Sequence, residues 1–103
     1  MRLSTFQVKV IKNTLGQVFG QSAQIYLFGS RVDDQKKGGD IDLFVDTKEN
    51  IPYQEFLSKT LHAVGLIQRQ IGEQKIDLVV SDGSLQQESL PVIQLARQTG
   101  VLL

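Results

Sequence analysis

Two segments of the chain share one pattern, in which a single aspartate stands second in a short apolar run: residues 41–45 (IDLFV) and 76–80 (IDLVV). Apolar runs of this length, rich in β-branched residues, are typical of strands. The segment between them predicts a helix of roughly 20 residues, long enough for the right-handed crossover that joins two parallel strands. Parallel pairing sets Asp77 beside Asp42, whereas antiparallel pairing separates them by about 15 Å, at about 3.3 Å per residue. The repeated pattern therefore favours a parallel pair with two carboxylates side by side.

Signals for helix ends surround these strands. Ser4 and Gln7 have the spacing of a capping box, and apolar residues then recur with a helical period until Gly20. Pro52 stands where a second helix begins, and Gly72 stands where it ends. The expected elements are a helix over about residues 5–19, strands over 24–28, 41–45 and 76–80, a helix over about 52–71, a short helical piece before Pro91, and a last helix over about 91–98.

The apolar residues of these helices predict the core. The second helix is expected to present one apolar stripe to it, made of Phe56, Leu57, Leu61, Val64 and Ile67. The last helix and the C-terminal tail are expected to complete it with Leu90, Val92, Ile93, Ala96 and residues 101–103. The alternative for the tail is that its exposed part forms a patch for a partner.

The first two strands are expected to be antiparallel. Gly29 and Ser30 stand at the exit of the first strand, and the polar connector 31–39 holds at most one helical turn. A connector this short can return the chain to Asp40 and Asp42 only if the strand direction reverses. Because the second and third strands are expected to be parallel, the sheet is mixed. We therefore predict a single α+β domain over residues 1–103, with a mixed sheet of about three to four strands backed by helices.

Composition excludes several classes of protein. The chain has no cysteine, which excludes disulfides and thiolate metal sites and leaves carboxylates as the metal ligands to consider. The 11 basic and 11 acidic residues leave no excess of positive charge, so a polynucleotide partner is disfavoured. No segment approaches the roughly 20 apolar residues of a membrane span, and the N-terminus lacks the apolar run of a signal peptide. We therefore expect a cytoplasmic protein.

Asp40 and Asp42 are candidate metal ligands. They are separated by one residue, and side chains alternate across a strand, so both point to the same face. Neighbouring carboxylates repel each other unless a cation lies between them, and Mg²⁺ prefers such hard oxygen ligands. With Asp77 from the next strand, the three carboxylates suit a two-metal phosphoryl-transfer site, whose ions lie about 4 Å apart. Asp77 is also a candidate to accept the proton of an attacking hydroxyl.

Gly29, Ser30 and Arg31 form a candidate phosphate-binding site. Gly29 lets the backbone approach a phosphate closely, and the amide and hydroxyl of Ser30 can donate hydrogen bonds to its oxygens. Arg31 adds a charge-assisted contact, and Lys36 and Lys37 make the connector locally positive. One polyphosphate would suit this cluster.

Simpler interpretations exist for these residues. The aspartates could begin strands and solvate their ends, although their joint occurrence with the Gly-Ser pair argues against this. Arg31 could pair on the surface with the acidic residues 33–34 instead of binding phosphate. The lysines 36–37 fit a solvated loop, and His62 fits an ordinary surface position on a helix.

Together these motifs resemble the signature of the DNA polymerase β-like nucleotidyltransferase superfamily: Gly29 and Ser30 at a strand exit, Asp40 and Asp42 on the next strand, and Asp77 on a later one. The chain is similar in length to the minimal nucleotidyltransferases of that group. The resemblance implies the nucleotidyltransferase fold and Mg²⁺-dependent transfer of a nucleoside monophosphate from ATP or another triphosphate to a hydroxyl, with release of pyrophosphate. It also implies that the three aspartates are the catalytic metal ligands.

The resemblance further implies a protein partner. Many minimal members are encoded beside a small, all-helical ribonuclease of the HEPN family and act as antitoxins that adenylylate a tyrosine on it. The connector 32–37 (VDDQKK) departs from the small, Ala-Arg-Gly-like sequence frequent in this group, so phosphate contacts beyond Arg31 are left open. Two alternatives are also left open: a non-catalytic module that neutralises its partner by contact alone, and a small-molecule nucleotidyltransferase of the aminoglycoside-modifying type. A homo-oligomer is a further open question.

Overall fold

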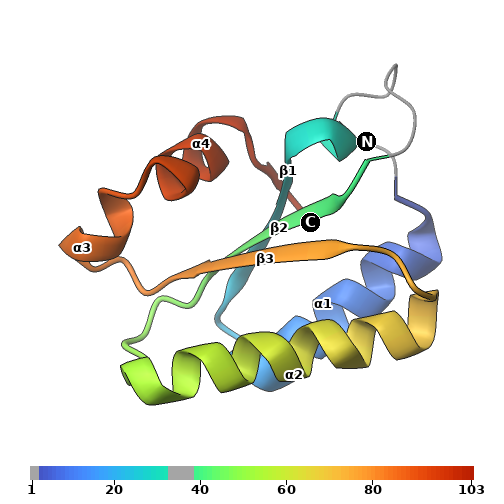
Figure 1. Cartoon of the computed structure of the whole chain (residues 1–103), viewed down its shortest axis with the longest axis horizontal. Helices are drawn as coiled ribbons and strands as arrows, with labels where there is room; N and C mark the ends of the chain where they lie inside the picture. Colours follow the sequence, from blue (N-terminus) through green and yellow to red (C-terminus); the bar gives the residue numbers. More distant parts are fainter. Residues whose placement is uncertain (1–2, 33–38) are drawn as a thin grey trace.

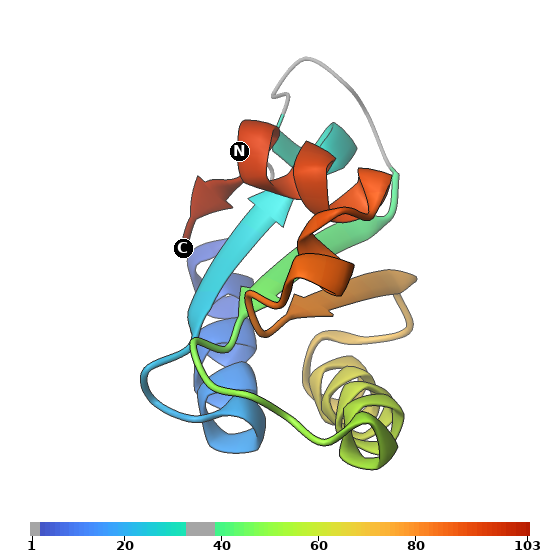
Figure 2. The same cartoon turned by 90° about the vertical axis from the view of Figure 1, so that its left-hand side faces the viewer.

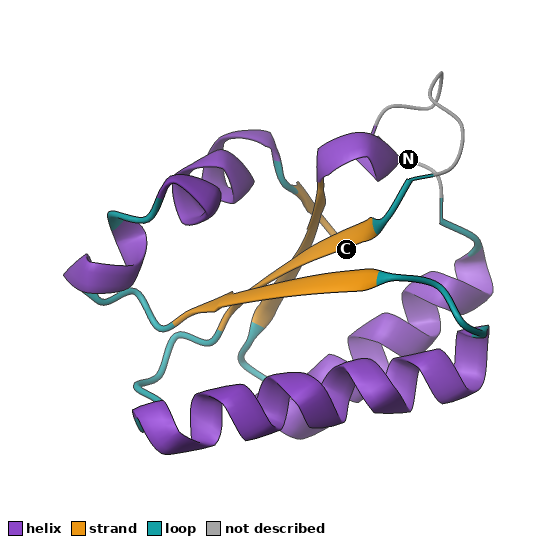
Figure 3. Cartoon of the chain, in the orientation of Figure 1, coloured by secondary structure: helices purple, strands orange, loops and turns teal. Residues whose placement is uncertain are grey.

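The computed structural model describes residues 3–32 and 39–103, which form one sheet with helices on both faces (Figures 1 and 3). Each expected helix and strand is present, with small shifts at its ends. No helix in the described ranges is long and apolar enough to cross a membrane. The elements are α1 (Thr5–Phe19), β1 (Gln24–Phe28), the 3₁₀ helix η1 (Gly29–Val32), β2 (Ile41–Asp46), α2 (Tyr53–Ile71), β3 (Ile76–Ser81), α3 (Leu85–Glu88), α4 (Pro91–Thr99) and β4 (Val101–Leu102).

The sheet is mixed, with the strand order β3-β2-β1-β4. β1 is antiparallel to β2 and to β4, whereas β2 and β3 are parallel. Their register aligns Asp42 with Asp77, and α2 is the crossover between them. The predicted fold class and both predicted strand directions are confirmed.

Local signals set the ends of the two long helices. The side chains and amides of Ser4 and Gln7 exchange hydrogen bonds of 3.1 and 2.9 Å, which completes the capping box at the start of α1. α2 follows Pro52 and stops at Gly72, whose φ of 98° is a left-handed conformation that residues with a Cβ rarely adopt. The stop at Gly72 determines where the chain turns back to begin β3.

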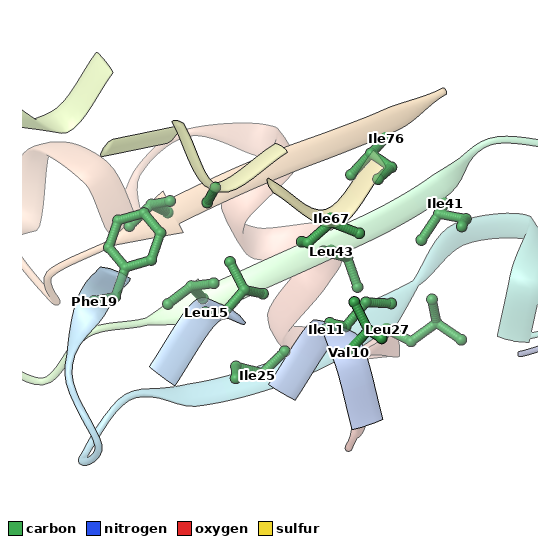
Figure 4. Close-up of a cluster of buried hydrophobic side chains, with 13 residues drawn as sticks. Val10, Ile11, Leu15, Phe19, Ile25, Leu27, Ile41, Leu43, Ile67 and Ile76 are labelled. Atoms are coloured by element: carbon green, nitrogen blue, oxygen red, sulfur yellow. The ribbon is translucent and has the colours of Figure 1, made fainter. Parts of the chain in front are cut away.

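The two faces of the sheet carry different layers (Figure 2). α1 and α2 cover one face and enclose the main core, in which Leu15, Leu43 and Ile67 are fully buried (Figure 4). α4 covers part of the other face through a smaller cluster made of Phe28, Phe44, Ile93 and Ala96. Because side chains alternate along each strand, β1, β2 and β3 contribute to both layers.

Leu57 and Leu61 do not face the core, so the expected stripe of α2 is wrong at these two positions. Their side chains are 67% and 64% exposed. The buried face of α2 includes Ala63, which lies two residues beyond Leu61 and therefore about 200° around the helix. The remaining members of the expected stripe do pack into or against the core: Phe56, Val64 and Ile67.

Part of the C-terminal region is also more exposed than expected. α4 contacts the sheet along one side only, through the buried Ile93 and Ala96, which are three residues apart. β4 pairs with β1 over two residues and is the last strand at this edge of the sheet among the residues that the structure describes. The expected core residues that the structure leaves exposed are Leu90, Val92, Val101 and Leu102.

Arg97 links α4 to the sheet through an ion pair and hydrogen bonds. Asp46, at the end of β2, has a side chain that is only 4% exposed, and Arg97 Nη1 donates a hydrogen bond to its Oδ2 at 2.8 Å. The same guanidinium donates from Nε and Nη2 to the Glu88 carboxylate at 2.8 and 3.0 Å. It also lies 4.9 Å from the centre of the Phe44 ring. Ser81 of β3 donates to Glu88, so the network joins β2, β3, α3 and α4.

This network favours the charged forms of both carboxyls. Burial opposes ionisation of Asp46, but hydrogen bonds from Arg97 and Lys48 outweigh it and lower the pKa of Asp46. Hydrogen bonds from Arg97 and Ser81 lower the pKa of Glu88. A carboxyl with a lower pKa in the folded state stabilises the fold above its unfolded pKa, and that stabilisation is lost as the pH falls through the folded pKa. The network therefore contributes fully at neutral pH and weakens below about pH 4.

Arg97→Ala should lower the free energy of unfolding by roughly 2–4 kcal/mol at pH 7, because it leaves the buried Asp46 carboxylate without this partner. Urea denaturation followed by circular dichroism measures the change. Lys12→Ala, at an exposed position on α1, is the matched control and should cost less than about 0.5 kcal/mol. The difference between the two variants should shrink as the pH is lowered from 7 to 3. Equal losses in both variants at pH 7 would contradict the role of the network.

Candidate active site

Asp42 and Asp77 lie on the sheet face that carries α4. Along β2, Asp42 shares its face with Phe44, which packs against α4. The parallel register sets Asp42 opposite Asp77, and the antiparallel register sets it opposite Phe28. The pair therefore lies where β2 and β3 begin and β1 ends, beside η1 (Figure 1).

Asp42 and Asp77 interact directly. Asp77 lies opposite Asp42 in the parallel register, and its carboxyl acts directly on that of Asp42. Burial raises the pKa of Asp42, and the charge and hydrogen bond of Asp77 raise it further, as does the charge of Asp40. The charge of Lys75 opposes these effects. Two neighbouring carboxyls of this kind form a site where a cation would be electrostatically favourable.

Asp40 lies beside this pair without joining it. Its Oδ2 is 3.4 Å from Nζ of Lys75; the Lys75 side chain is 71% exposed and that of Asp40 is 42% exposed. Across residues 3–32 and 39–103, no three aspartate, glutamate, histidine or cysteine side chains gather closely enough to hold a metal ion. The structure thus brings together two of the three predicted ligands and pairs the third with a lysine.

Gly29 lies directly against Asp42. Its φ is 75°, and a Cβ at this position would lie 3.0 Å from Asp42 Cγ and closer still to Oδ2. Either feature alone disfavours any other residue here. The sequence suggests that this glycine lets the backbone approach a phosphate, and the structure adds that it makes room for the Asp42 carboxylate. The Gly-Ser motif and the Asp-x-Asp motif are therefore parts of one site.

Ser30 and Arg31 follow Gly29 in η1, which lies against β2. Their side chains, and the connector residues 33–38 with both lysines, lie outside the described part of the structure. Their contacts with phosphate therefore stay predictions.

The oxygen donors of the site fit a divalent cation. Asp42 and Asp77 offer hard oxygen ligands from two adjacent strands, and a cation would relieve the repulsion that raises the pKa of Asp42. Gly29 leaves the backbone side of the Asp42 carboxylate free of a side chain. Asp42 and Asp77 would hold the ion, and Asp40 is the remaining candidate ligand.

Lys75 is a site residue that the sequence alone did not single out. Its Nζ contacts Asp40, and its charge acts on Asp42. The available signal was the same alternation that groups Asp40 with Asp42, because Lys75 and Asp77 are also separated by one residue.

Asp42→Asn should stabilise the chain in metal-free buffer by a few tenths to about 1 kcal/mol, because it removes one of two carboxyls that repel each other. The same variant should lose the rise in melting temperature that Mg²⁺ or Mn²⁺ produces in the unaltered chain. Thermal denaturation with and without each ion measures both effects. Glu73→Gln, at an exposed position before β3, should change neither. An Asp42→Asn variant that is less stable without metal would contradict the repulsion.

Gly29→Ala tests the contact between the two motifs. It should destabilise the chain by about 2–3 kcal/mol, because left-handed backbone strain adds to the overlap with Asp42. In the Asp42→Ala background the same substitution should cost only about 1 kcal/mol, since little beyond the strain then remains. A double-mutant cycle from denaturant titrations gives the difference. Equal costs in both backgrounds would show that Gly29 does not make room for Asp42.

Comparison with known proteins agrees with this arrangement. The family described as "Polymerase beta, Nucleotidyltransferase" matches residues 9–103. This range contains every strand of the sheet and both Asp42 and Asp77, which we call the acid pair. No curated protein sequence matches the chain. Because the family match covers nearly the whole chain and the fold is the mixed sheet that the sequence predicts, the chain belongs to the polymerase β nucleotidyltransferase family.

Proposed function

We propose that this chain catalyses the Mg²⁺-dependent transfer of a nucleoside monophosphate, AMP from ATP, to a hydroxyl on a separate acceptor. Membership of the family supports nucleotidyl transfer in general. The observation that carries the proposal for this chain is the alignment of Asp42 with Asp77 across β2 and β3, with a raised pKa of Asp42. A family member that had lost its activity and kept only a structural role would gain nothing from two neighbouring carboxyls, because they destabilise the fold when no metal ion is bound.

The reaction joins the acceptor oxygen to the α-phosphorus of the nucleotide. The bond from the α-phosphorus to the bridging oxygen breaks, and pyrophosphate leaves with that electron pair. Asp77 accepts the proton of the attacking hydroxyl. Asp40, Asp42 and Asp77 would hold Mg²⁺, which when bound would neutralise charge that develops on the phosphate oxygens. The protein's contribution is mainly position and charge, so no nucleophilic side chain is required.

The phosphates are proposed to bind at the exit of β1. Gly29 brings the backbone of η1 next to Asp42, which favours an approach of phosphate to the same place as the metal ligands. Ser30 and Arg31 follow at once and would donate hydrogen bonds to the phosphate oxygens. Removing the Arg31 charge would then weaken nucleotide binding without removing the acid pair.

The acceptor is proposed to be a tyrosine hydroxyl on a small helical partner of the HEPN family, so that the chain acts as an antitoxin. This rests on the resemblance to minimal nucleotidyltransferases. One feature of the structure supports a protein acceptor: α4, on the same sheet face as the acid pair, exposes Val92 and Leu95 to solvent. Exposed apolar side chains beside a site suit contact with another protein.

The test incubates the chain with ATP labelled at the α-phosphate, Mg²⁺ and the protein encoded by the adjacent gene. Label should appear on that protein and should be at least about 100-fold weaker with Asp42→Ala or Asp77→Ala. Glu73→Gln should transfer label normally. Mass spectrometry should place the added mass of AMP on a tyrosine.

Other outcomes would overturn parts of the proposal. Full neutralisation of the partner by Asp42→Ala, with no label on any protein, would favour a non-catalytic binding module. Label on an added aminoglycoside but not on protein would favour a small-molecule transferase. Label from GTP but not from ATP would change only the proposed identity of the nucleotide substrate.

A further inference from the structure

The outer side of α2 carries an apolar ridge that no other described part of the chain covers. Leu57, Leu61 and Gly65 follow one another at four-residue intervals and therefore line up along the helix. Both leucines are about two-thirds exposed, and a Cβ at Gly65 would meet open space. In Figures 1 and 2, α2 forms one border of the molecule, and no other described element lies over its outer side. Neither the core nor the acid pair uses this ridge.

Hollows flank the ridge on both sides. The hollow toward β3 has a volume of about 300 Å³ and is lined by Phe56, Leu57, Thr60 and Leu78. The second hollow has a volume of about 180 Å³ and is lined by Leu61, His62, Gly65, Leu66 and Arg69. A leucine projecting from another helix could enter the second hollow because Gly65 has no side chain to fill it.

The ridge is complementary to itself. We propose that α2 packs antiparallel against α2 of a second copy of this chain, with Leu61 next to the two-fold axis. In this register Leu57 lies four residues before the centre and Gly65 four residues after it, so each Leu57 faces the Gly65 of the other copy. Each leucine then enters the hollow around that glycine, and the two contacts are equivalent by symmetry. Rows of side chains spaced by four residues are those that interlock when helices pack.

The charges on α2 favour the same register. Glu55 lies in the first turn and Arg69 in the last, 14 residues apart, which is close to four helical turns. Both therefore project from the same flank of the helix. In the antiparallel pair, Arg69 of one copy lies within two residues of the level of Glu55 in the other, and the contact forms twice. In a parallel pair Glu55 and Arg69 of different copies would lie 14 residues apart in level, so this contact could not form.

The ridge itself favours a second copy over a strongly charged partner. Apart from the leucines and Gly65, the outer side of α2 carries the uncharged residues Gln54, next to Glu55, and Ser58. An uncharged strip does not repel its own copy. The acid pair lies on the α4 face, and α2 packs on the opposite face, so both sites stay open in the pair. The inference is therefore independent of the proposed function.

Cross-linking tests the register directly, because the chain has no cysteine of its own. Leu61→Cys should form a disulfide between two copies under mild oxidation, since residues at the axis come within the distance that a disulfide needs. Leu57→Cys is the matched control. Two copies of residue 57 would lie about 12 Å apart along the helix axis, given a rise of about 1.5 Å per residue, and should not cross-link. Cross-linking of both variants at equal rates would overturn the register.

Sedimentation equilibrium tests the association without cross-links. Leu61→Glu should raise the dissociation constant of the dimer by roughly 100-fold, because it places two carboxylates at an apolar centre. Gly65→Leu should also weaken the dimer, although the single chain has room for that side chain. Leu95→Glu, at a half-exposed leucine on α4, should leave the dissociation constant unchanged. Unchanged circular dichroism and melting temperature would show that each variant folds.

Two results would overturn the proposal. The first is an unaltered chain that remains monomeric at concentrations of several hundred micromolar. The second is a dimer that Leu61→Glu and Gly65→Leu leave intact. A monomer whose binding to a different protein depends on Leu61 would assign the ridge to that partner and reject the second copy.

Discussion

The in-register parallel pairing of β2 with β3 is the constraint on which the rest of the molecule depends. In both strands the residues that alternate with the aspartates face α1 and α2, where Leu43 and Val80 are buried. A slip of one residue would exchange the two faces and place a carboxylate in that core. The core therefore fixes the register, and the register brings Asp42 and Asp77 together whether or not they repel. Burial of apolar side chains on one face of the sheet therefore keeps Asp42 and Asp77 close together on the other face, against their mutual repulsion.

β2 carries two acidic residues on the α4 face with opposite environments. Asp46 is almost fully buried and receives hydrogen bonds from Arg97, so its pKa is lowered and its charge stabilises the fold. Asp42, four residues earlier, has Asp77 as its neighbour, and its pKa is raised. The same strand thus holds one carboxylate paired directly with an arginine and one for which the described residues show no such ion pair. This contrast, more than the number of acids, distinguishes a structural site from one open to a ligand.

Much of the fold was predictable because its signals are local. Capping at Ser4, the stop at Gly72 and the repeated Ile-Asp-Leu each act within a few residues or through one crossover. The outward orientation of Leu57 was not predictable in this way. Leucines four residues apart fit a buried stripe as well as Ala63 and Ile67 do, and only the position of the sheet decides which side is covered. The contact of Asp40 with Lys75 likewise depends on the register of two strands distant in sequence.

A helix that joins parallel strands needs only one apolar side, because only one side meets the sheet. α2 has two apolar sides, and its outer one includes a glycine in mid-helix that costs about 1 kcal/mol relative to alanine. No contact among the described residues requires that glycine, since a Cβ would meet open space there. Exposed leucines beside an unnecessary glycine are unfavourable for a monomer, but they are complementary halves of one contact in an antiparallel pair. The fold can therefore separate two roles, with chemistry on the α4 face and association on the side of α2 turned away from the sheet.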